Sequence, residues 1–139
     1  MARILAIDYG LKRTGLAVTD PLQLIATGLT TVDSREIISF LRQYFSREDV
    51  RLIIVGEPKN WDESDTHATP LVNNFIKKLK KEFPQIPLKT VDERYTSKMA
   101  KQAMIEMGLK KKDRRNKRIV DEIAATILLQ EYLENPLAS

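Results

Sequence analysis

The chain has 139 residues, a mass of 16.0 kDa, 42% hydrophobic residues and 30% charged residues, which is the composition of one folded globular domain. It has no cysteine and one histidine, which excludes disulfides, thiolate chemistry, zinc sites built on cysteine and sites with several histidines. The net charge is +4, but seven cations and one acid lie between Lys110 and Arg118. This segment contributes +6, so the rest of the chain is slightly acidic, at −2.

The chain begins with only a short apolar run. Residues 4–7 are apolar and Asp8 ends the run, which is too short for the core of a signal peptide. No run approaches the roughly 18 residues that a membrane helix needs. We therefore expect a cytoplasmic protein without membrane contact.

The first third of the chain predicts three short strands, at 3–8, 14–20 and 27–32, joined by tight turns in an antiparallel meander. A helix is expected next, because Asp33 and Glu36 have the spacing of an N-cap and its capping-box partner. Apolar residues at helical intervals follow, up to Phe45.

The remaining chain alternates strands and helices. Strands are expected at 51–55 and 88–91, on either side of a helix that starts near Thr66 or Pro70. Two more helices, at 97–107 and 119–134, enclose the basic segment. Because strand–helix–strand crossovers give parallel, right-handed pairs, the first strand is expected in the centre. The fold class is α/β, with a mixed five-stranded sheet of order 3-2-1-4-5 and helices on both faces.

Acidic residues lie at the ends of three expected strands. Asp8 ends the first strand, Glu57 follows the fourth, and Asp92 and Glu93 follow the fifth. The carboxyl ends of parallel strands form the edge where open α/β sheets bind ligands. Mg²⁺ and Mn²⁺ prefer such oxygen ligands. The pattern indicates a divalent-cation site, although turn capping, or ion pairs with Arg94, would explain each acid singly.

The last expected helix supplies a further acid. Asp121 shares one stripe with Ala124, Ala125 and Leu128, at spacings that place all four on one helix face. We expect this stripe to face the sheet, which puts Asp121 near the start of a buried face and next to the basic segment. Glu122 lies on a neighbouring line and is the weaker candidate. A favourable interaction with the helix dipole would also explain Asp121.

Four stretches stand out, in order along the chain: 8–20 (DYGLKRTGLAVTD), 55–60 (VGEPKN), 92–97 (DERYTS) and 120–130 (VDEIAATILLQ). They resemble the motifs of the YqgF family, whose bacterial members are described as Holliday junction resolvases and as pre-16S rRNA processing nucleases. The resemblance covers essentially the whole chain. It implies an RNase H-like fold, which agrees with the strand order above, and a single nuclease domain over 1–139 with a basic, mobile segment at 109–118.

The resemblance also implies a reaction. This is metal-dependent hydrolysis of phosphodiester bonds, with the 5′ end of pre-16S rRNA as the preferred substrate. The family's acidic site carries over onto Asp8, Glu93 and Asp121, as catalytic residues and as ligands of two Mg²⁺ or Mn²⁺ ions roughly 3.5–4 Å apart. Glu57 stands where the family often has an apolar residue, and it remains a second-rank ligand together with Asp92.

Basic residues near the same rim are the candidate substrate-binding residues. Binding through several phosphate contacts depends steeply on salt and carries no sequence information. The alternative interpretation is a solvated loop for the basic segment and ordinary turn solvation for Lys12 and Arg13. The candidates are Lys12, Arg13, Arg94, Lys110, Lys111, Lys112, Arg114 and Arg115.

The expected partner is nucleic acid, either structured RNA or branched DNA, and the protein is expected to be a monomer or a homodimer. Three other functions remain open. The first is a Holliday junction resolvase in recombination and repair, which requires a symmetric dimer. The second is a nucleic-acid-binding RNase H-like module that does not cleave. The third is a nucleotide-binding fragment of the actin and sugar-kinase type, which the length disfavours because that fold needs two such domains.

Overall fold

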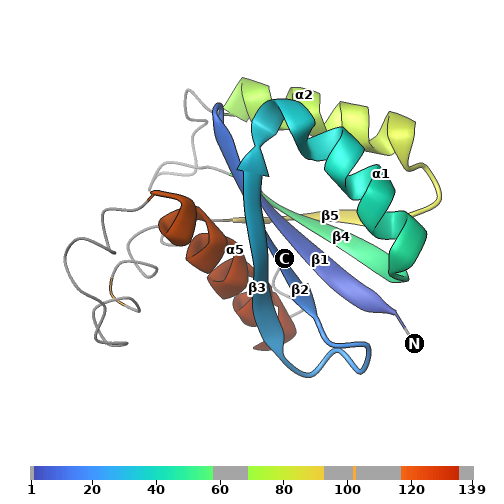
Figure 1. The fold of residues 1–139 in the computed structure, drawn as a ribbon, viewed down its shortest axis with the longest axis vertical. Helices are drawn as coiled ribbons and strands as arrows, with labels where there is room; N and C mark the ends of the chain where they lie inside the picture. Colours follow the sequence, from blue (N-terminus) through green and yellow to red (C-terminus); the bar gives the residue numbers. More distant parts are fainter. Residues whose placement is uncertain (1, 58–68, 93–101, 103–116, 135–139) are drawn as a thin grey trace.

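The computed structural model describes residues 2–57, 69–92, 102 and 117–134 (Figure 1). All five expected strands are present, while the helix expected at 97–107 and most of the basic segment lie outside the described residues. In the described part of the chain, no helix combines the length and the apolar character needed to cross a bilayer. The elements are β1 (Arg3–Tyr9), β2 (Arg13–Thr19), β3 (Ala26–Asp33), the 3₁₀ helix η1 (Ser34–Glu36), α1 (Ile37–Arg47), β4 (Val50–Glu57), α2 (Thr69–Glu82), β5 (Leu88–Asp92) and α5 (Lys117–Glu134).

The five strands form one mixed sheet in the order β3-β2-β1-β4-β5, which confirms the order expected from the sequence. The pairs β1–β2 and β2–β3 are antiparallel, and β1–β4 and β4–β5 are parallel. The central strand β1 therefore has a neighbour of each kind. The carboxyl ends of β1, β4 and β5 lie at the same edge of the sheet, as the crossover rule requires.

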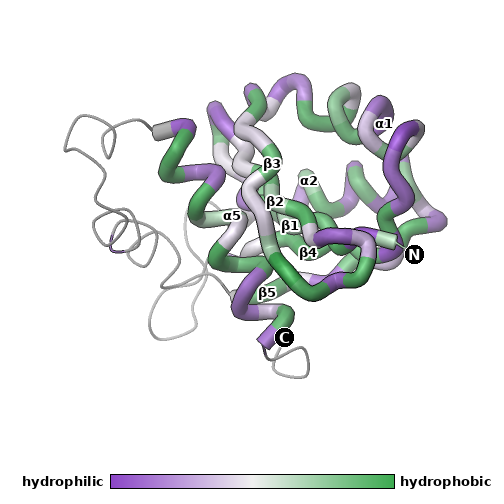
Figure 2. The backbone as a smooth tube through the Cα atoms, turned by 60° about the horizontal axis from the view of Figure 1, so that its bottom comes forward, coloured by the Kyte–Doolittle hydropathy of each residue, from purple (hydrophilic) through white to green (hydrophobic). Residues whose placement is uncertain are grey.

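Helices cover both faces of the sheet (Figure 1). The face under α1 and α2 contains the larger core cluster, in which Leu5 and Ile7 of β1 pack near Leu41 and Phe75. The opposite face contains a second cluster, in which Ile4 and other residues of the sheet meet α5. Figure 2 shows hydrophobic stretches along the strands and a mixture of hydrophilic and hydrophobic residues along the helices. Full burial of one such aliphatic side chain stabilises the fold by about 1.5–3 kcal/mol.

The start of α1 differs from the expected capping box. Asp33 makes no side-chain cap hydrogen bond, and a 3₁₀ turn precedes α1, which starts at Ile37 with an N-cap residue, Glu36, that also makes no side-chain cap hydrogen bond. The capping-box prediction was wrong because the Asp33 carboxylate lies 3.0 Å from the guanidinium of Arg118 on α5. A tertiary ion pair has replaced the local cap.

Candidate active site at the ends of β1 and α5

Asp8 lies near the carboxyl end of the central strand, on the face covered by α5. Side chains alternate between the two faces along a strand. Ile4 and Ala6 belong to the core cluster under α5, so Asp8, two residues further along, projects from the same face. It is half-buried. The rigid centre of the sheet thus holds this carboxylate at the edge of the apolar layer.

Gly15 explains how α5 comes close to Asp8. Gly15 on β2 is the direct antiparallel partner of Asp8, and residues paired in this way project from the same face with Cβ positions about 4.5–5.5 Å apart. A Cβ added to Gly15 would collide with the backbone carbonyl of Asp121 on α5. The missing side chain therefore lets the first turns of α5 lie directly over β2, beside Asp8. Sequence reasoning missed Gly15, although a glycine inside a strand pattern often marks a close approach of another backbone.

Asp121 is held by an arginine of the sheet. The Arg13 Nε donates a hydrogen bond to the Asp121 Oδ2 at 3.0 Å, between side chains that are about one quarter exposed. Arg13 is the first residue of β2, so the contact joins the start of that strand to the start of α5. The sequence predicted Arg13 as a phosphate contact, and in the structure Arg13 pairs with this carboxylate.

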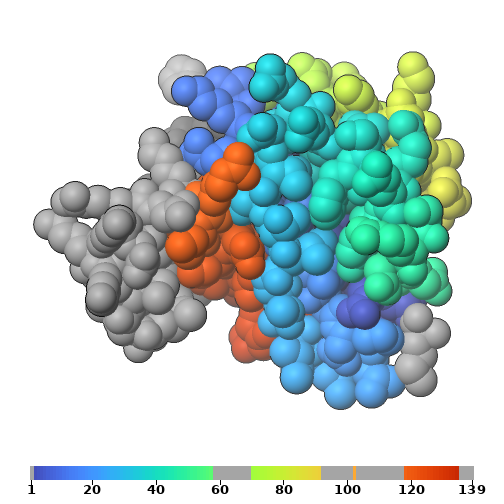
Figure 3. Space-filling model, in the orientation of Figure 1, coloured from blue at the N-terminus to red at the C-terminus, as the bar shows by residue number. Residues whose placement is uncertain are grey.

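A second set of contacts fixes the start of α5 to β3. Arg118 donates to the Asp33 carboxylate and to the carbonyl of Thr31, each at 3.0 Å, and the Thr31 hydroxyl donates to the Arg118 carbonyl at 2.7 Å. Figure 3 shows the first turns of α5 lying against β3. Arg118 was assigned to the basic segment, but its described contacts are structural. The helix that carries Asp121 is thus anchored on two strands.

The two second-rank acids lie on neighbouring strands. The backbones of Glu57 and Asp92 are direct partners at the ends of β4 and β5. Ile53 and Val55 of β4 pack in the cluster under α1 and α2, so strand alternation assigns Glu57 to that face. Glu57 and Asp8 therefore project from opposite faces.

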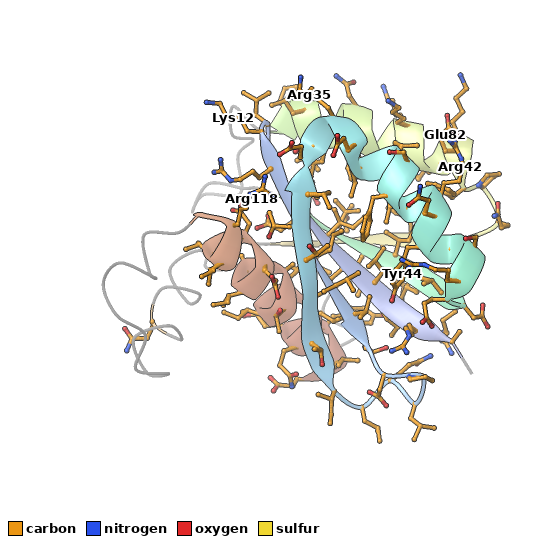
Figure 4. The ribbon with its side chains drawn as sticks, viewed as in Figure 1. Lys12, Arg35, Arg42, Tyr44, Glu82 and Arg118 are labelled. Atoms are coloured by element: carbon orange, nitrogen blue, oxygen red, sulfur yellow. The ribbon has the colours of Figure 1, made fainter. Side chains whose placement is uncertain are left out.

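The remaining candidates fall into two groups. Lys12 is an exposed residue of the turn between β1 and β2, and Figure 4 shows it at the same end of the molecule as Arg118. Among the described residues no three acidic or histidine side chains are grouped closely enough to hold a metal ion. The candidates that lie outside the described residues are Glu93, Arg94, Lys110, Lys111, Lys112, Arg114 and Arg115.

Asp20 provides a contrast with the two acids of the site. It lies in the turn between β2 and β3, where its carboxylate accepts hydrogen bonds from the backbone N–H groups of Leu22, Leu24 and Ile25. The N–H group of Ile25 makes the largest contribution to lowering the pKa of Asp20 below its usual range. Such a carboxylate organises a turn, whereas the Asp121 carboxylate accepts a hydrogen bond from the side chain of Arg13.

The donor set suits a hard divalent cation. Asp8 and Asp121 bring carboxylate oxygens to one face of the sheet, from a strand and a helix that Gly15 allows to approach each other. Oxygen donors of this kind select Mg²⁺ or Mn²⁺, and the chain offers no thiolate that would favour a softer metal. The chemistry of these two carboxylates therefore suits such a cation.

Comparison with known proteins gives a consistent result. Residues 2–135 match the model of the family RuvX, described as Holliday junction resolvase. A protein of Christiangramia forsetii is 56% identical over 96% of this chain and 98% of its own length, and one of Bacteroides thetaiotaomicron is 53% identical over 97% and 98%. Both carry the name "Putative pre-16S rRNA nuclease".

Solved structures support the fold. The chain is similar to T. thermophilus RuvC in complex with a Holliday junction substrate, with a TM-score of 0.55, 15% identity and coverage of 96% of both chains. It is also similar to the Fowlpox virus resolvase in complex with Holliday junction DNA, with a TM-score of 0.51, 17% identity and coverage of 94% and 98%. At these identities the likeness concerns the fold, and it confirms the RNase H-like architecture expected from the sequence.

Proposed function

Because this chain belongs to the RuvX family, we propose that it is a metal-dependent nuclease that hydrolyses phosphodiester bonds and processes the 5′ end of pre-16S rRNA. The observation that carries the proposal is the approach of Asp121 to the Gly15 position opposite Asp8, on a scaffold that also serves resolvases. The relatives named above favour ribosomal RNA as the substrate. Processing of that RNA would place the protein in the bacterial cytoplasm.

Asp8, Glu93 and Asp121 are the proposed catalytic residues and metal ligands, with Glu57 and Asp92 in second rank. Bound Mg²⁺ or Mn²⁺, with two ions expected, would activate a water and stabilise the leaving oxygen. Asp8 lies on the central strand of the sheet, β1. Arg13 orients the Asp121 carboxylate toward the sheet through its 3.0 Å contact and offsets its charge.

The test is cleavage of a pre-16S rRNA fragment by the purified protein with Mg²⁺ or Mn²⁺. Asp8→Asn and Asp121→Asn should each reduce cleavage by at least about 100-fold, because each variant removes a negatively charged ligand while keeping its shape. Asp49→Asn is the matched control, since Asp49 is exposed and its backbone carbonyl, which the substitution keeps, accepts the hydrogen bond from Arg3 N–H.

Asp49→Asn should cleave like the wild type, and all three variants should remain folded by circular dichroism. A wild-type protein that binds the fragment with metal present but never cuts it would contradict the nuclease proposal. It would instead support a module that binds nucleic acid without cleavage.

Basic residues are the proposed substrate contacts, and the basic segment is expected to supply most of them. Five phosphate contacts would add about 3.5 to the slope of log affinity against log salt for a single strand. Replacing the five residues by alanine should lower RNA affinity and flatten the slope by up to that amount, measured by fluorescence anisotropy. An unchanged slope would refute the role of the segment. The five are Lys110, Lys111, Lys112, Arg114 and Arg115, and Lys12, Arg13 and Arg94 are the further proposed contacts.

A second candidate function is Holliday junction resolution. It is favoured by the description of the family and by the two junction-bound structures with the same fold. Junction resolution requires two active sites related by a two-fold axis. A homodimer in solution that cuts a four-way DNA junction symmetrically, with pre-16S rRNA left intact, would decide for this function. A monomer that trims RNA would decide against it.

A further inference from the structure

A cavity of about 280 Å³ opens on the face opposite Asp8, between the end of β1 and the starts of α1 and α2. We propose that this cavity binds one unpaired nucleotide of an RNA substrate, next to the reacting phosphate. The proposal rests on the proposed nuclease function and adds the substrate class, single-stranded rather than continuously paired RNA. The residues that line the cavity are Tyr9, Leu11, Ser34, Arg35, Ile37, Ile38, Leu71, Asn74, Phe75 and Lys78.

The floor of the cavity is aromatic. The rings of Tyr9 and Phe75 are stacked, with centroids 4.1 Å apart and planes at 11°. Phe75 is buried in the core, whereas Tyr9 is only half-buried. Leu11 is 70% exposed and Leu71 is 38% exposed, so apolar surface continues to the mouth of the cavity. Flat, apolar surfaces of this kind bind nucleobases by stacking, without preference for one base.

The rim of the cavity is cationic. Arg35 and Lys78 are exposed lining residues, and Lys12 follows Leu11 on the same turn. Within the described ranges, no ion pair joins these three cations to an acid, whereas Arg3, Arg13, Arg42 and Arg118 each meet a carboxylate. Figure 4 shows Lys12 and Arg35 at the same end of the molecule. The apolar floor therefore suits the base of a nucleotide, and the cations at the rim suit its negatively charged phosphate.

The turn between β1 and β2, which borders the cavity, is preorganised. The buried Ser34 hydroxyl donates to the Gly10 carbonyl at 2.5 Å, and the Ser34 N–H donates to the Lys12 carbonyl at 3.0 Å. The Thr14 hydroxyl lies 2.8 Å from the same Ser34 hydroxyl. These bonds hold the turn that carries Leu11 and Lys12, so binding a nucleotide does not first have to order it.

The position of Tyr9 on β1, directly after Asp8, indicates which part of a substrate the cavity binds. Tyr9 lines the cavity and directly follows Asp8, and strand alternation sends the two side chains to opposite faces. A backbone that crosses the end of β1 would therefore bring a phosphate to Asp8 and a neighbouring base to the cavity. A base can enter only after leaving its stack and its pair. The volume, near the lower limit of about 300 Å³ for small-molecule sites, suits one base.

The experiment measures binding by fluorescence anisotropy, with EDTA present so that no cleavage occurs. The probes are a short single-stranded RNA, the same strand with one base removed, and the corresponding duplex. The double variant Arg35→Gln with Lys78→Gln removes the rim charges. The control, Arg51→Gln with Lys77→Gln, removes two exposed cations that do not line the cavity. All four residues are exposed, so both variants should fold.

The rim variant should bind single-stranded RNA about tenfold more weakly, with a salt slope smaller by about 1.4, as expected for two lost phosphate contacts. Its affinity for the duplex should change less than twofold, and the control should match the wild type on every probe. The wild type should bind the strand lacking a base more weakly than the intact strand. Equal losses in both variants, equal losses on strand and duplex, or no effect of the missing base would each overturn the proposal.

These outcomes are independent of the nuclease proposal because no cleavage is measured. Cleavage of pre-16S rRNA by the wild type is assayed separately with metal. If the protein cuts RNA but the rim variant and the control do not differ, the nuclease proposal stands and the cavity proposal is wrong. A protein that never cuts RNA but shows the expected binding differences has the cavity site without the nuclease function.

Discussion

The two faces of the sheet differ, although Asp8 and Tyr9, which project from opposite faces, are neighbours on β1. On the α5 face, Asp8 lies opposite a glycine, the helix backbone comes close to the sheet, and Arg13 pairs with Asp121. On the face of α1 and α2, large side chains such as Leu41 and Phe75 fill the core, and the exposed cations Arg35 and Lys78 line an open cavity. The pleat of β1 thus separates the Asp8 carboxylate from the cavity that Tyr9 lines, because the two side chains project from opposite faces of the sheet.

If this separation holds, a large loss of core on the α2 face should leave the metal site intact. Leu41 is fully buried there. Leu41→Ala should lower the free energy of unfolding by about 2–5 kcal/mol through lost burial and a cavity. Urea unfolding measures the loss, and calorimetry of Mn²⁺ binding to the still-folded variant should give the wild-type affinity. A large fall in that affinity would show that the two faces are coupled.

A smaller change on the α5 face should affect both properties. Gly15→Ala places a methyl group against the Asp121 carbonyl, and overpacking of this kind costs about 1–3 kcal/mol. Because the first turns of α5 have to move away, Mn²⁺ affinity and RNA cleavage should fall as well.

Gly28→Ala is the matched control for Gly15→Ala. A Cβ at Gly28 would meet the end of the Glu122 side chain, with Oε1 at 2.5 Å, and not a backbone. That side chain can rotate away, so the cost should be less than about 1 kcal/mol and Mn²⁺ affinity should stay unchanged. If both glycine variants behave alike, close backbone approach is not what builds the site.

The smallest expected effect concerns Arg13. Arg13→Gln removes the cation beside Asp121, and an ion pair of this exposure contributes about 1 kcal/mol or less to stability. Mn²⁺ should bind a few-fold more tightly, since the metal no longer competes with a guanidinium for the carboxylate. Arg118→Gln removes the other ion pair at the start of α5 and should leave Mn²⁺ affinity unaltered. Weaker metal binding by Arg13→Gln would show that Arg13 is needed to position Asp121.

Patterns local in sequence predicted much of the fold. The apolar run before Asp8 marked β1, and the crossovers after it required a central position for that strand, which the structure confirms. The stripe of Ala124, Ala125 and Leu128 predicted a buried face of α5, and all three residues are buried. Periodicity reports which face of an element is covered, so these predictions needed no knowledge of distant contacts.

Contacts between distant segments were beyond such reasoning. Asp33 has the spacing of a helix cap, yet its carboxylate pairs with Arg118, 85 positions later. Arg13 was expected to face phosphate, yet it meets Asp121, 108 positions later. In both cases the partner of a charged side chain lies far away along the chain. The choice depends on where α5 lies on the sheet, which no short stretch of sequence specifies.

The sequence by itself determined the α/β fold class, the strand order, the family resemblance, and the set of acids and bases from which we propose a metal and nucleic-acid site. Only the tertiary structure decided that Gly15 brings the Asp121 backbone over β2, beside Asp8, that Arg13 and Arg118 serve α5, and that Tyr9 closes a cavity on the other face. The reason is physical. Alternation and helical period are properties of one segment, whereas close approach, ion pairing and cavities depend on how two surfaces fit together.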